Sequence, residues 1–323
     1  MRFFERHQWL FMIMAIFVGL GLGQVETAGV AERFILPFLM VMVFGVFLQV
    51  PLARLREGFR SKRLVALSLI VNFLWTPLLA FGLAHLFFRD APDVFLAMLM
   101  DMVTPCTDWY LVFTGIAGGH LAVSAALLPW NLLLQLVLLP VYLLLFAGAV
   151  VEIQPQVILL SFLKALLAPF FLAVVARNII LRAKGQDWFQ GNVLGRVSFL
   201  QALFLHLAIL SMFASQGAVL IQNAALVLRL IVPVAIFFSV NFALGQLLSR
   251  VFRLPYRDGV SLIITVLARN APLALTIAVA AFPDRPLIPL VLAVESMIEL
   301  PMLFVLAQVL LLIRRRNWWP DPT

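Results

Sequence analysis

Long apolar runs, separated by short polar segments, follow one another along nearly the whole chain. Runs such as 64–88 and 121–146 are long enough to cross the hydrocarbon core of a bilayer, which takes roughly 20 residues of helix. Of the 323 residues, 64% are apolar and only 12% are charged, whereas a typical soluble domain has about 25% charged residues. A soluble core cannot bury so much apolar surface. The runs therefore predict a polytopic membrane protein.

The continuity of these runs distinguishes helices from strands. Inside a bilayer every backbone polar group has to be hydrogen-bonded internally, which leaves helices or a closed barrel. Barrel strands alternate in polarity over short segments, whereas these runs are apolar throughout. We therefore expect an all-α fold of ten transmembrane helices, the first of them a span and not a cleavable signal peptide. The expected helices are 9–25, 34–52, 64–88, 94–116, 121–147, 156–176, 194–215, 224–249, 259–282 and 286–313.

Lys and Arg residues are distributed unevenly over the predicted loops. With the N-terminus in the cytoplasm, only Arg33, Arg89 and Arg285 fall on the opposite side, and the other loop Lys and Arg residues are cytoplasmic. This asymmetry predicts an inner (plasma) membrane protein with both termini in the cytoplasm. The net charge of +8 is spread over all the cytoplasmic loops, so we expect the lipid bilayer and no nucleic acid as a partner.

The two halves of the chain resemble each other. Asn72 and Asn241 lie in identical Val-Asn-Phe triplets, and the next helix in each half is interrupted at a proline, Pro105 or Pro272. Five helices per half is an odd number, so the second copy has to be inserted upside down. Inverted repeats with discontinuous helices are the usual plan of secondary transporters, whose site lies near the bilayer midplane. The predicted repeats are residues 1–150 and 151–323, with fourth and ninth helices that are broken and cross.

Seven charged residues fall in or beside the apolar runs, where a charge costs at least about 2.5 kcal/mol unless it faces a partner or water. They are Asp101, Asp108, Lys164, Arg229, Arg269, Glu295 and Glu299. For Lys164 and Arg229, a structural ion pair is the simplest interpretation. The other five lie in or just after the two interrupted helices. We expect Asp101, Arg269 and Glu295 to set the electrostatics of a pocket there.

The interrupted segments 102–109 and 268–272 hold the candidate binding residues. These are Cys106, Thr107 and Asp108 in the first half and Asn270 in the second. Because Cys106 is the only cysteine, an intramolecular disulfide and a multi-thiol metal cage are excluded, and we expect no metal and no cofactor. A lone cysteine is usually a small buried apolar residue. Here it follows a helix-breaking proline, where a thiol suits a soft, thiophilic solute.

These segments resemble a known family. The matching residues are 105–107, 118–120, 269–274 and 298–301, together with Asn131 and Pro140. They look like the fourth, fifth, ninth and tenth helices of the arsenical-resistance (arsenite efflux) transporters, which belong to the bile acid:sodium symporter superfamily. The resemblance covers most of the chain and implies a ten-span, five-plus-five inverted topology. It also implies that Cys106 and Asn131 contribute to substrate binding and that Glu299 carries a coupling proton.

Departures from this resemblance bear on the coupling ion. Arg269 falls where sodium-coupled relatives carry a glutamine that helps to ligate sodium, and Thr265 falls where they carry a glutamate. Tyr110-Leu111 stands in place of their Ser-Asn pair, and His120 stands where the arsenite branch often has Asp. A guanidinium is always charged and would repel a cation. The resemblance therefore implies proton exchange, without sodium coupling.

Two functions remain open on the sequence. The first is export of arsenite, with antimonite as a second substrate, by proton antiport and alternating access. The second keeps the fold but transports an organic anion, bile-acid-like or carboxylate-like, with Arg269 or Arg229 as its counter-charge. We do not expect an enzyme or a receptor, because no intramembrane His-Glu motif, Ser-Lys dyad or sensory domain is evident. The sequence leaves open whether the chain forms a homodimer.

Overall fold

A computed structural model describes residues 8–23, 28–49, 62–107, 109–148 and 155–319. Within these ranges the chain is almost entirely helical, and β-type pairing is limited to one isolated antiparallel bridge between Pro105 and Arg269. Seven of the described helices are long and apolar enough to cross a membrane, and shorter apolar helices cover 13–22 and 271–281. The prediction of an all-α polytopic membrane protein is confirmed. The count of ten transmembrane helices stays a prediction.

Contacts between residues divide the chain into two compact units, each built from three separate segments. Unit 1 consists of Met1–Val50, Ile153–Val227 and Pro272–Val294. Unit 2 consists of Pro51–Glu152, Leu228–Ala271 and Glu295–Thr323. Each unit takes segments from both halves of the chain. These units are defined by contacts in space, whereas the predicted repeats, 1–150 and 151–323, are defined by similarity in sequence. The repeats stay a prediction.

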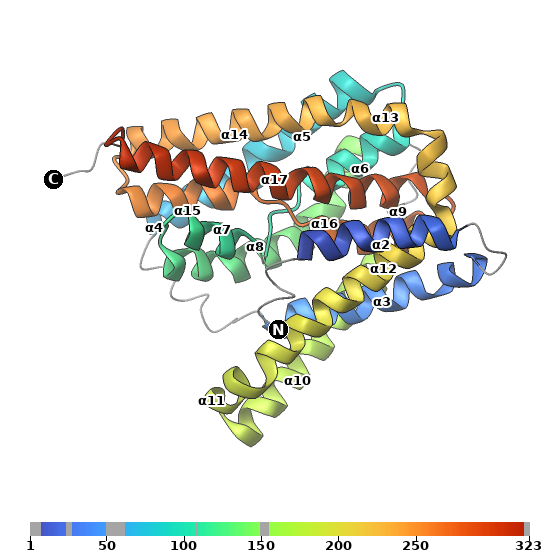
Figure 1. The fold of residues 1–323 in the computed structure, drawn as a ribbon. Helices are drawn as coiled ribbons and strands as arrows, with labels where there is room; N and C mark the ends of the chain where they lie inside the picture. Colours follow the sequence, from blue (N-terminus) through green and yellow to red (C-terminus); the bar gives the residue numbers. More distant parts are fainter. Residues whose placement is uncertain (1–7, 24–27, 50–61, 108, 149–154, 320–323) are drawn as a thin grey trace. The chain divides into compact units, whose positions relative to one another are not determined.

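Unit 1 is a bundle of long helices in which α12 packs along α2 and α3, and α10 packs against α3 (Figure 1). Its helices are α2 (Gln8–Leu22), α3 (Ala28–Gln49), α9 (Pro155–Phe162), α10 (Ala168–Lys184), α11 (Gln186–Phe189) and α12 (Gly195–Gln222), with most of α16 (Ala271–Ala281). A Cβ added at Gly19 would lie 2.6 Å from the carbonyl oxygen of Leu210. Glycine therefore permits the close approach of α2 to α12, as small residues do between membrane helices.

Two basic residues of unit 1, Arg177 and Lys164, lie in surroundings that differ from those predicted. Helix α10 continues to Lys184, so Arg177 lies within a helix and not in the predicted cytoplasmic loop. Its Nη1 donates to the carbonyl of Leu48 over 2.8 Å, which satisfies a carbonyl in the last turn of α3 that has no intrahelical partner. Lys164 lies in a π-helical turn, Leu163–Leu167, with an exposed side chain. No ion pair of Lys164 is found in the part of the chain that the structure describes.

Unit 2 is organised around two interrupted helices (Figure 1). The first interruption separates α6 (Pro92–Met102) from α7 (Trp109–Ile116), and the second follows α15 (Tyr256–Leu267). The helices around them are α4 (Lys62–Ile70), α5 (Thr76–Phe88), α8 (Leu121–Tyr142), α14 (Ile231–Val251) and the part of α17 (Leu287–Arg315) from Glu295 on. Helix α15 packs against α4, α7, α8 and α14. Short helix α13 (Ala224–Arg229) ends in unit 2, and π-helical turns cover Val71–Trp75, Leu143–Ala147 and, in unit 1, Gln190–Leu194.

Local chemistry explains both interruptions. Pro105 has no backbone N–H, and proline disfavours helical geometry in the residue before it. Helix α15 ends because Ala268 is extended, with φ −73° and ψ 135°. Pro272 then occupies the first turn of α16, where a missing N–H does no harm. The two prolines at which interruptions were predicted therefore act differently. Pro105 lies inside its interruption, whereas Pro272 lies in the first turn of the helix that follows.

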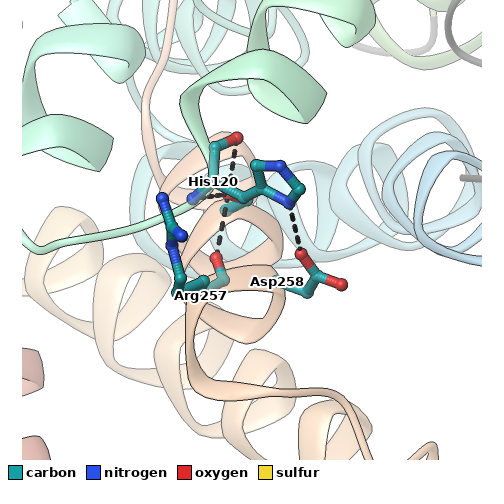
Figure 2. A network of polar contacts seen from close by, with 4 residues as sticks. His120, Arg257 and Asp258 are labelled. Atoms are coloured by element: carbon teal, nitrogen blue, oxygen red, sulfur yellow. Dashed lines mark hydrogen bonds and ion pairs between the residues drawn. The ribbon is translucent and has the colours of Figure 1, made fainter.

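The turn between α7 and α8 is hydrogen-bonded to the first turns of α15 (Figure 2). The backbone N–H of His120 donates to the carbonyl of Arg257 over 3.0 Å and to the hydroxyl of Ser261 over 2.8 Å. The His120 Nδ1 lies 2.9 Å from the Asp258 carboxylate. Gly118 supports this turn with a φ of +74°, which glycine adopts without strain. The turn that ends α7, the helix after the first interruption, is thus held to α15, the helix that precedes the second.

Candidate functional site

The two helix interruptions pair with each other through their backbones. The N–H of Cys106 donates to the carbonyl of Ala268 over 3.0 Å, and the N–H of Asn270 donates to the carbonyl of Thr104 over 2.8 Å. A broken helix leaves backbone groups that lipid cannot satisfy. Here each break satisfies groups of the other. Two segments far apart in the sequence are therefore fixed side by side inside unit 2.

Three of the four predicted binding residues in the interruptions lie close to this pairing. The side chains of Cys106, Thr107 and Asn270 are all buried, and the Asn270 amide donates to the Thr107 hydroxyl over 3.2 Å. Asp108, the fourth, lies outside the described residues. A thiol, a hydroxyl and a carboxamide are thus combined where the two chain segments meet. This arrangement can offer one soft ligand and several hydrogen bonds to a small solute.

Arg269 lies at the centre of the pairing and is 2% exposed. Its guanidinium donates to the carbonyls of Met102, Val266 and Leu267 and to the side-chain oxygen of Asn72. Asn72 lies on the π-helical turn Val71–Trp75 and is fully buried. Such a turn inside an α-helix is frequent at functional sites. Arg269 thereby connects both interruptions to a third helix.

Two buried carboxyl groups, Glu299 and Asp101, interact with this arginine, and a third, Glu295, interacts with those two. Glu299 accepts the backbone N–H of Arg269 over 2.7 Å, and Glu295 lies one turn earlier on α17. Asp101, in the last turn of α6, interacts electrostatically with Arg269 and with both glutamates. Within the described residues, Glu295 and the Asp101 Oδ1 have no hydrogen-bond partner. The cluster therefore has more acidic groups than its guanidinium can balance, and binding of a proton would relieve the excess.

Asn131 is the predicted binding residue that the structure does not bring into this hydrogen-bond network. It is fully buried on α8, which packs against α7 and α15. Its amide oxygen and nitrogen have no hydrogen-bond partner among the described residues, and the same is true of Gln135, one turn further along. Buried unpaired amides require an explanation such as water or a ligand. The role of Asn131 in substrate binding stays a prediction.

Arg229 is held at a different place. Its Nη1 lies 3.1 Å from one oxygen of Asp90, in the turn between α5 and α6, and its Nη2 donates to the carbonyl of Phe87 over 2.8 Å. The side chains of Arg229 and Asp90 are 45% and 66% exposed. The hydrogen bond from Arg229 holds the pKa of Asp90 below its ordinary value. The ion-pair interpretation of Arg229 is confirmed.

Sequence reasoning missed three features of the described structure: Asn72, Asp258 and a set of backbone carbonyls. Asn72 carried a signal, because it belongs to the repeated Val-Asn-Phe triplet, but the triplet served only as evidence of a repeat. Asp258, the partner of His120, carried no signal beyond its place in a polar loop. The carbonyls of Met102, Val266 and Leu267 are backbone groups. They could have been identified only by knowing at which residue each helix ends.

Comparison with known proteins gives a consistent set of relatives. The model of the Sodium Bile acid symporter family matches residues 36–223. The Arsenical-resistance protein Acr3 of Corynebacterium glutamicum is 25% identical over 98% of this chain and 90% of its own length. The protein of the same name in Alkaliphilus metalliredigens is 22% identical over 99% and 95%. The Uncharacterized sodium-dependent transporter YocS of Bacillus subtilis is 23% identical over 80% and 77%.

Proposed function

Because the chain belongs to the Sodium Bile acid symporter family, we propose that it is a secondary transporter that exports arsenite by proton antiport and without sodium. Two relatives named Arsenical-resistance protein support this substrate, since they align with nearly the whole chain. Antimonite is the second proposed substrate. We further propose that the chain lies in the inner membrane with both termini in the cytoplasm, as the distribution of its Lys and Arg residues implies.

The observation that carries the substrate proposal is the position of the only thiol, Cys106, inside the paired interruptions. At neutral pH arsenite is a small uncharged trihydroxide. The Cys106 thiol attacks arsenic, a sulfur–arsenic bond forms, an arsenic–oxygen bond breaks, and the thiol proton leaves with that hydroxide as water. Thr107 and Asn270 offer hydrogen bonds to the two remaining hydroxyls. A single thiol holds arsenic more weakly than three would, so the solute can be released.

Glu299 provides the proposed proton coupling. Its carboxylate accepts the backbone N–H of Arg269, and a charged acceptor makes a stronger bond than a neutral one. Binding of a proton at Glu299 would weaken this bond between α17 and the second interruption. Because Cys106 is hydrogen-bonded to the residue before Arg269, the change would be passed to the binding segment. Asp101 and Glu295 are the neighbouring acidic groups between which such a proton would be shared.

The organic-anion alternative has less support. It requires an arginine that is available as a counter-charge, and both candidates already have partners. Arg229 pairs with Asp90, and the guanidinium of Arg269 is occupied by four oxygen acceptors. An uncharged solute needs no such arginine.

A resistance assay tests the substrate. In an arsenite-sensitive bacterial host, the wild-type chain is expected to raise the tolerated arsenite concentration, and Cys106→Ser is expected to abolish that gain at equal membrane expression. Thr114→Ser, a similarly small change at a buried position on α7, outside both interruptions, serves as the matched control and should retain resistance. Full resistance with Cys106→Ser would refute the role of the thiol. Absence of resistance with the wild-type chain would refute arsenite export and favour the organic anion.

A further inference from the structure

The guanidinium of Arg269 is surrounded by oxygen atoms that carry no formal charge. Its Nε donates to the Leu267 carbonyl over 3.3 Å, its Nη1 to the Met102 carbonyl over 3.1 Å, and its Nη2 to the Asn72 Oδ1 over 3.0 Å. The Nη2 also donates to the carbonyl of Val266. Within the described residues, none of these side-chain bonds goes to a carboxylate. Glu299 accepts a hydrogen bond from the backbone N–H of Arg269 instead.

Three of these acceptors are carbonyls at the ends of interrupted helices. Met102 is the last residue of α6, and Leu267 is the last residue of α15, directly after Val266. The last carbonyls of a helix have no intrahelical partner, and the helix dipole gives that end a partial negative charge. Two half-helices therefore direct their negative ends toward one point. The group found at that point is a cation.

Carbonyl and amide oxygens are also the ligands that hard metal cations take in proteins. In membrane transporters, the C-terminal ends of interrupted helices commonly coordinate a cation in this way. The fourth ligand, Asn72, comes from a π-helical turn and is fully buried, so its oxygen is held in place. On another side, the guanidinium carbon lies 5.5 Å from the centre of the Phe237 ring, whose face attracts a cation. The surroundings suit positive charge and do not require an arginine in particular.

An ordinary buried arginine would be expected to pair with a carboxylate, since an unpaired buried charge is costly. Arg229 follows that pattern with Asp90. Arg269 interacts with Glu299 and Asp101 electrostatically, but within the described residues its guanidinium donates hydrogen bonds only to uncharged oxygens. We infer that unit 2 contains a monovalent-cation site, formed by Asn72 and the carbonyls of Met102, Val266 and Leu267, which the chain fills permanently with the guanidinium of Arg269. This tethered cation stands in for a bound sodium ion and makes the transporter independent of sodium. The transport consequence rests on the proposed function, whereas the site itself does not.

Emptying the site tests the inference without any substrate. Purified Arg269→Ala protein is unfolded thermally in choline chloride, sodium chloride or guanidinium chloride, at equal low-millimolar concentration, where guanidinium does not denature. Because a ligand that binds only the folded state raises the Tm, we expect guanidinium, sodium or both to raise the Tm of Arg269→Ala relative to choline. The wild-type protein should show no such difference. Arg229→Ala, which removes an arginine with an exposed carboxylate partner, is the matched control and should show none either.

Two results would overturn the inference. One is a folded Arg269→Ala protein whose Tm is the same in all three salts. The other is a wild-type Tm or transport rate that rises with sodium, since a site already filled cannot bind it. If Arg269→Ala does not yield folded protein, the Tm of Arg269→Gln, which retains bulk and an amide donor, is measured in the same salts. A Tm that is the same in all three salts would then overturn the inference.

A transport measurement extends the test. The transport rate of Arg269→Ala is expected to be about 100-fold below that of the wild type, because a hydrogen-bonded charged group is removed, and to recover at least in part in guanidinium or sodium. If wild-type protein does not transport arsenite but Arg269→Ala still shows the cation-dependent Tm, the substrate is wrong and the cation site stands. If wild-type protein transports arsenite and Arg269→Ala shows neither response, the cation site is wrong and the transport function stands.

Discussion

Arg229 and Arg269 occupy similar places in the sequence, each within an apolar stretch of a predicted helix, but the structure holds them in opposite ways. Arg229 is at the end of α13, 45% exposed, and binds both oxygens of Asp90. Arg269 is 2% exposed and directs its guanidinium at uncharged oxygens only. At an exposed helix end, a carboxylate from a neighbouring turn serves as the partner. In an interrupted helix, the backbone itself supplies the acceptors.

The comparison indicates at which positions a charged side chain in a membrane protein can take part in function. A pair such as Arg229–Asp90 is screened by water and contributes little beyond local order. A guanidinium enclosed by helix ends is coupled to the geometry of those ends, so any change in them alters its energy. We therefore expect changes at Arg269 and its ligands to affect transport, and changes at Arg229 and Asp90 to leave it nearly unchanged.

The largest effect is expected for Arg269→Gln, which removes the charge from between the two helix ends. Transport should fall about 100-fold, because the loss combines an uncompensated pair of helix ends with several missing hydrogen bonds. Arg229→Gln should retain at least half of the wild-type rate. Initial rates in membrane vesicles, corrected for expression, give both values. Equal losses in the two variants would show that the two arginines do not differ in the way proposed.

A smaller effect is expected for Glu299→Gln, which keeps an acceptor for the Arg269 N–H but cannot bind and release a proton. Transport driven by a pH gradient should fall about tenfold, whereas exchange of arsenite at equal pH should fall less, because binding at Cys106 is retained. The two rates are compared in the same vesicles. Glu32→Gln, which alters an acidic side chain of unit 1, is the control. A pH-driven rate equal to that of the wild type would exclude Glu299 as the proton carrier.

A still smaller effect is expected for Asn72→Ala, which removes one of the four oxygens around the guanidinium. Loss of about 1 kcal/mol should lower the transport rate roughly fivefold. Asn241→Ala offers a closely matched control, because Asn241 is the corresponding residue of the second Val-Asn-Phe triplet and is equally buried. Its side-chain oxygen accepts from the indole N–H of Trp75, and none of the Arg269 hydrogen bonds found among the described residues goes to Asn241. If both variants lose the same amount, the effect of Asn72 is one of packing.

The smallest effect is expected at Asp90. Because Arg229 lowers the pKa of Asp90 in the folded protein below its ordinary value of 3.8, the pair contributes stability above pH 3.8 and loses it as the pH falls through the folded pKa. Asp90→Asn should therefore lower the Tm slightly near neutral pH, and the difference from the wild type should shrink toward pH 3. Transport should be unaffected. A large Tm difference that does not change with pH would mean that Asp90 acts through something other than its charge.

Much of the fold followed from simple patterns in the sequence. The apolar runs predicted the long helices, and the prolines at 105 and 272 marked where two helices are interrupted, because a missing donor has a local cost that sequence alone reveals. The expectation that the interruptions meet grouped Cys106, Asp108, Arg269 and Asn270, of which Asp108 lies outside the described residues. The backbone pairing of Cys106 with Ala268 now gives that grouping a geometry.

Other features depend on contacts between distant segments and left no local pattern. The partner of Arg229 is Asp90, which lies in a loop 139 positions away, and neither residue indicates the other. Asn72 could be noticed as part of a repeat, but its bond to Arg269 depends on how α15 packs against α4, which precedes the π-helical turn. Arg177 was misplaced because α10 extends beyond its apolar run, to Lys184. In each case the partner of the side chain, or the end of the helix, depends on how the helices pack. The apolar pattern predicts only that a helix is present.

Uptake of arsenite into everted membrane vesicles tests the central claim most directly. Vesicles containing the wild-type chain are given an acid interior in sodium-free choline buffer, beside vesicles with Cys106→Ser and vesicles without the chain. We predict arsenite accumulation in the wild-type vesicles that collapses when the pH gradient is dissipated, does not increase when sodium replaces choline, and is absent with Cys106→Ser. Accumulation that requires sodium, or that persists undiminished with Cys106→Ser, would contradict the account.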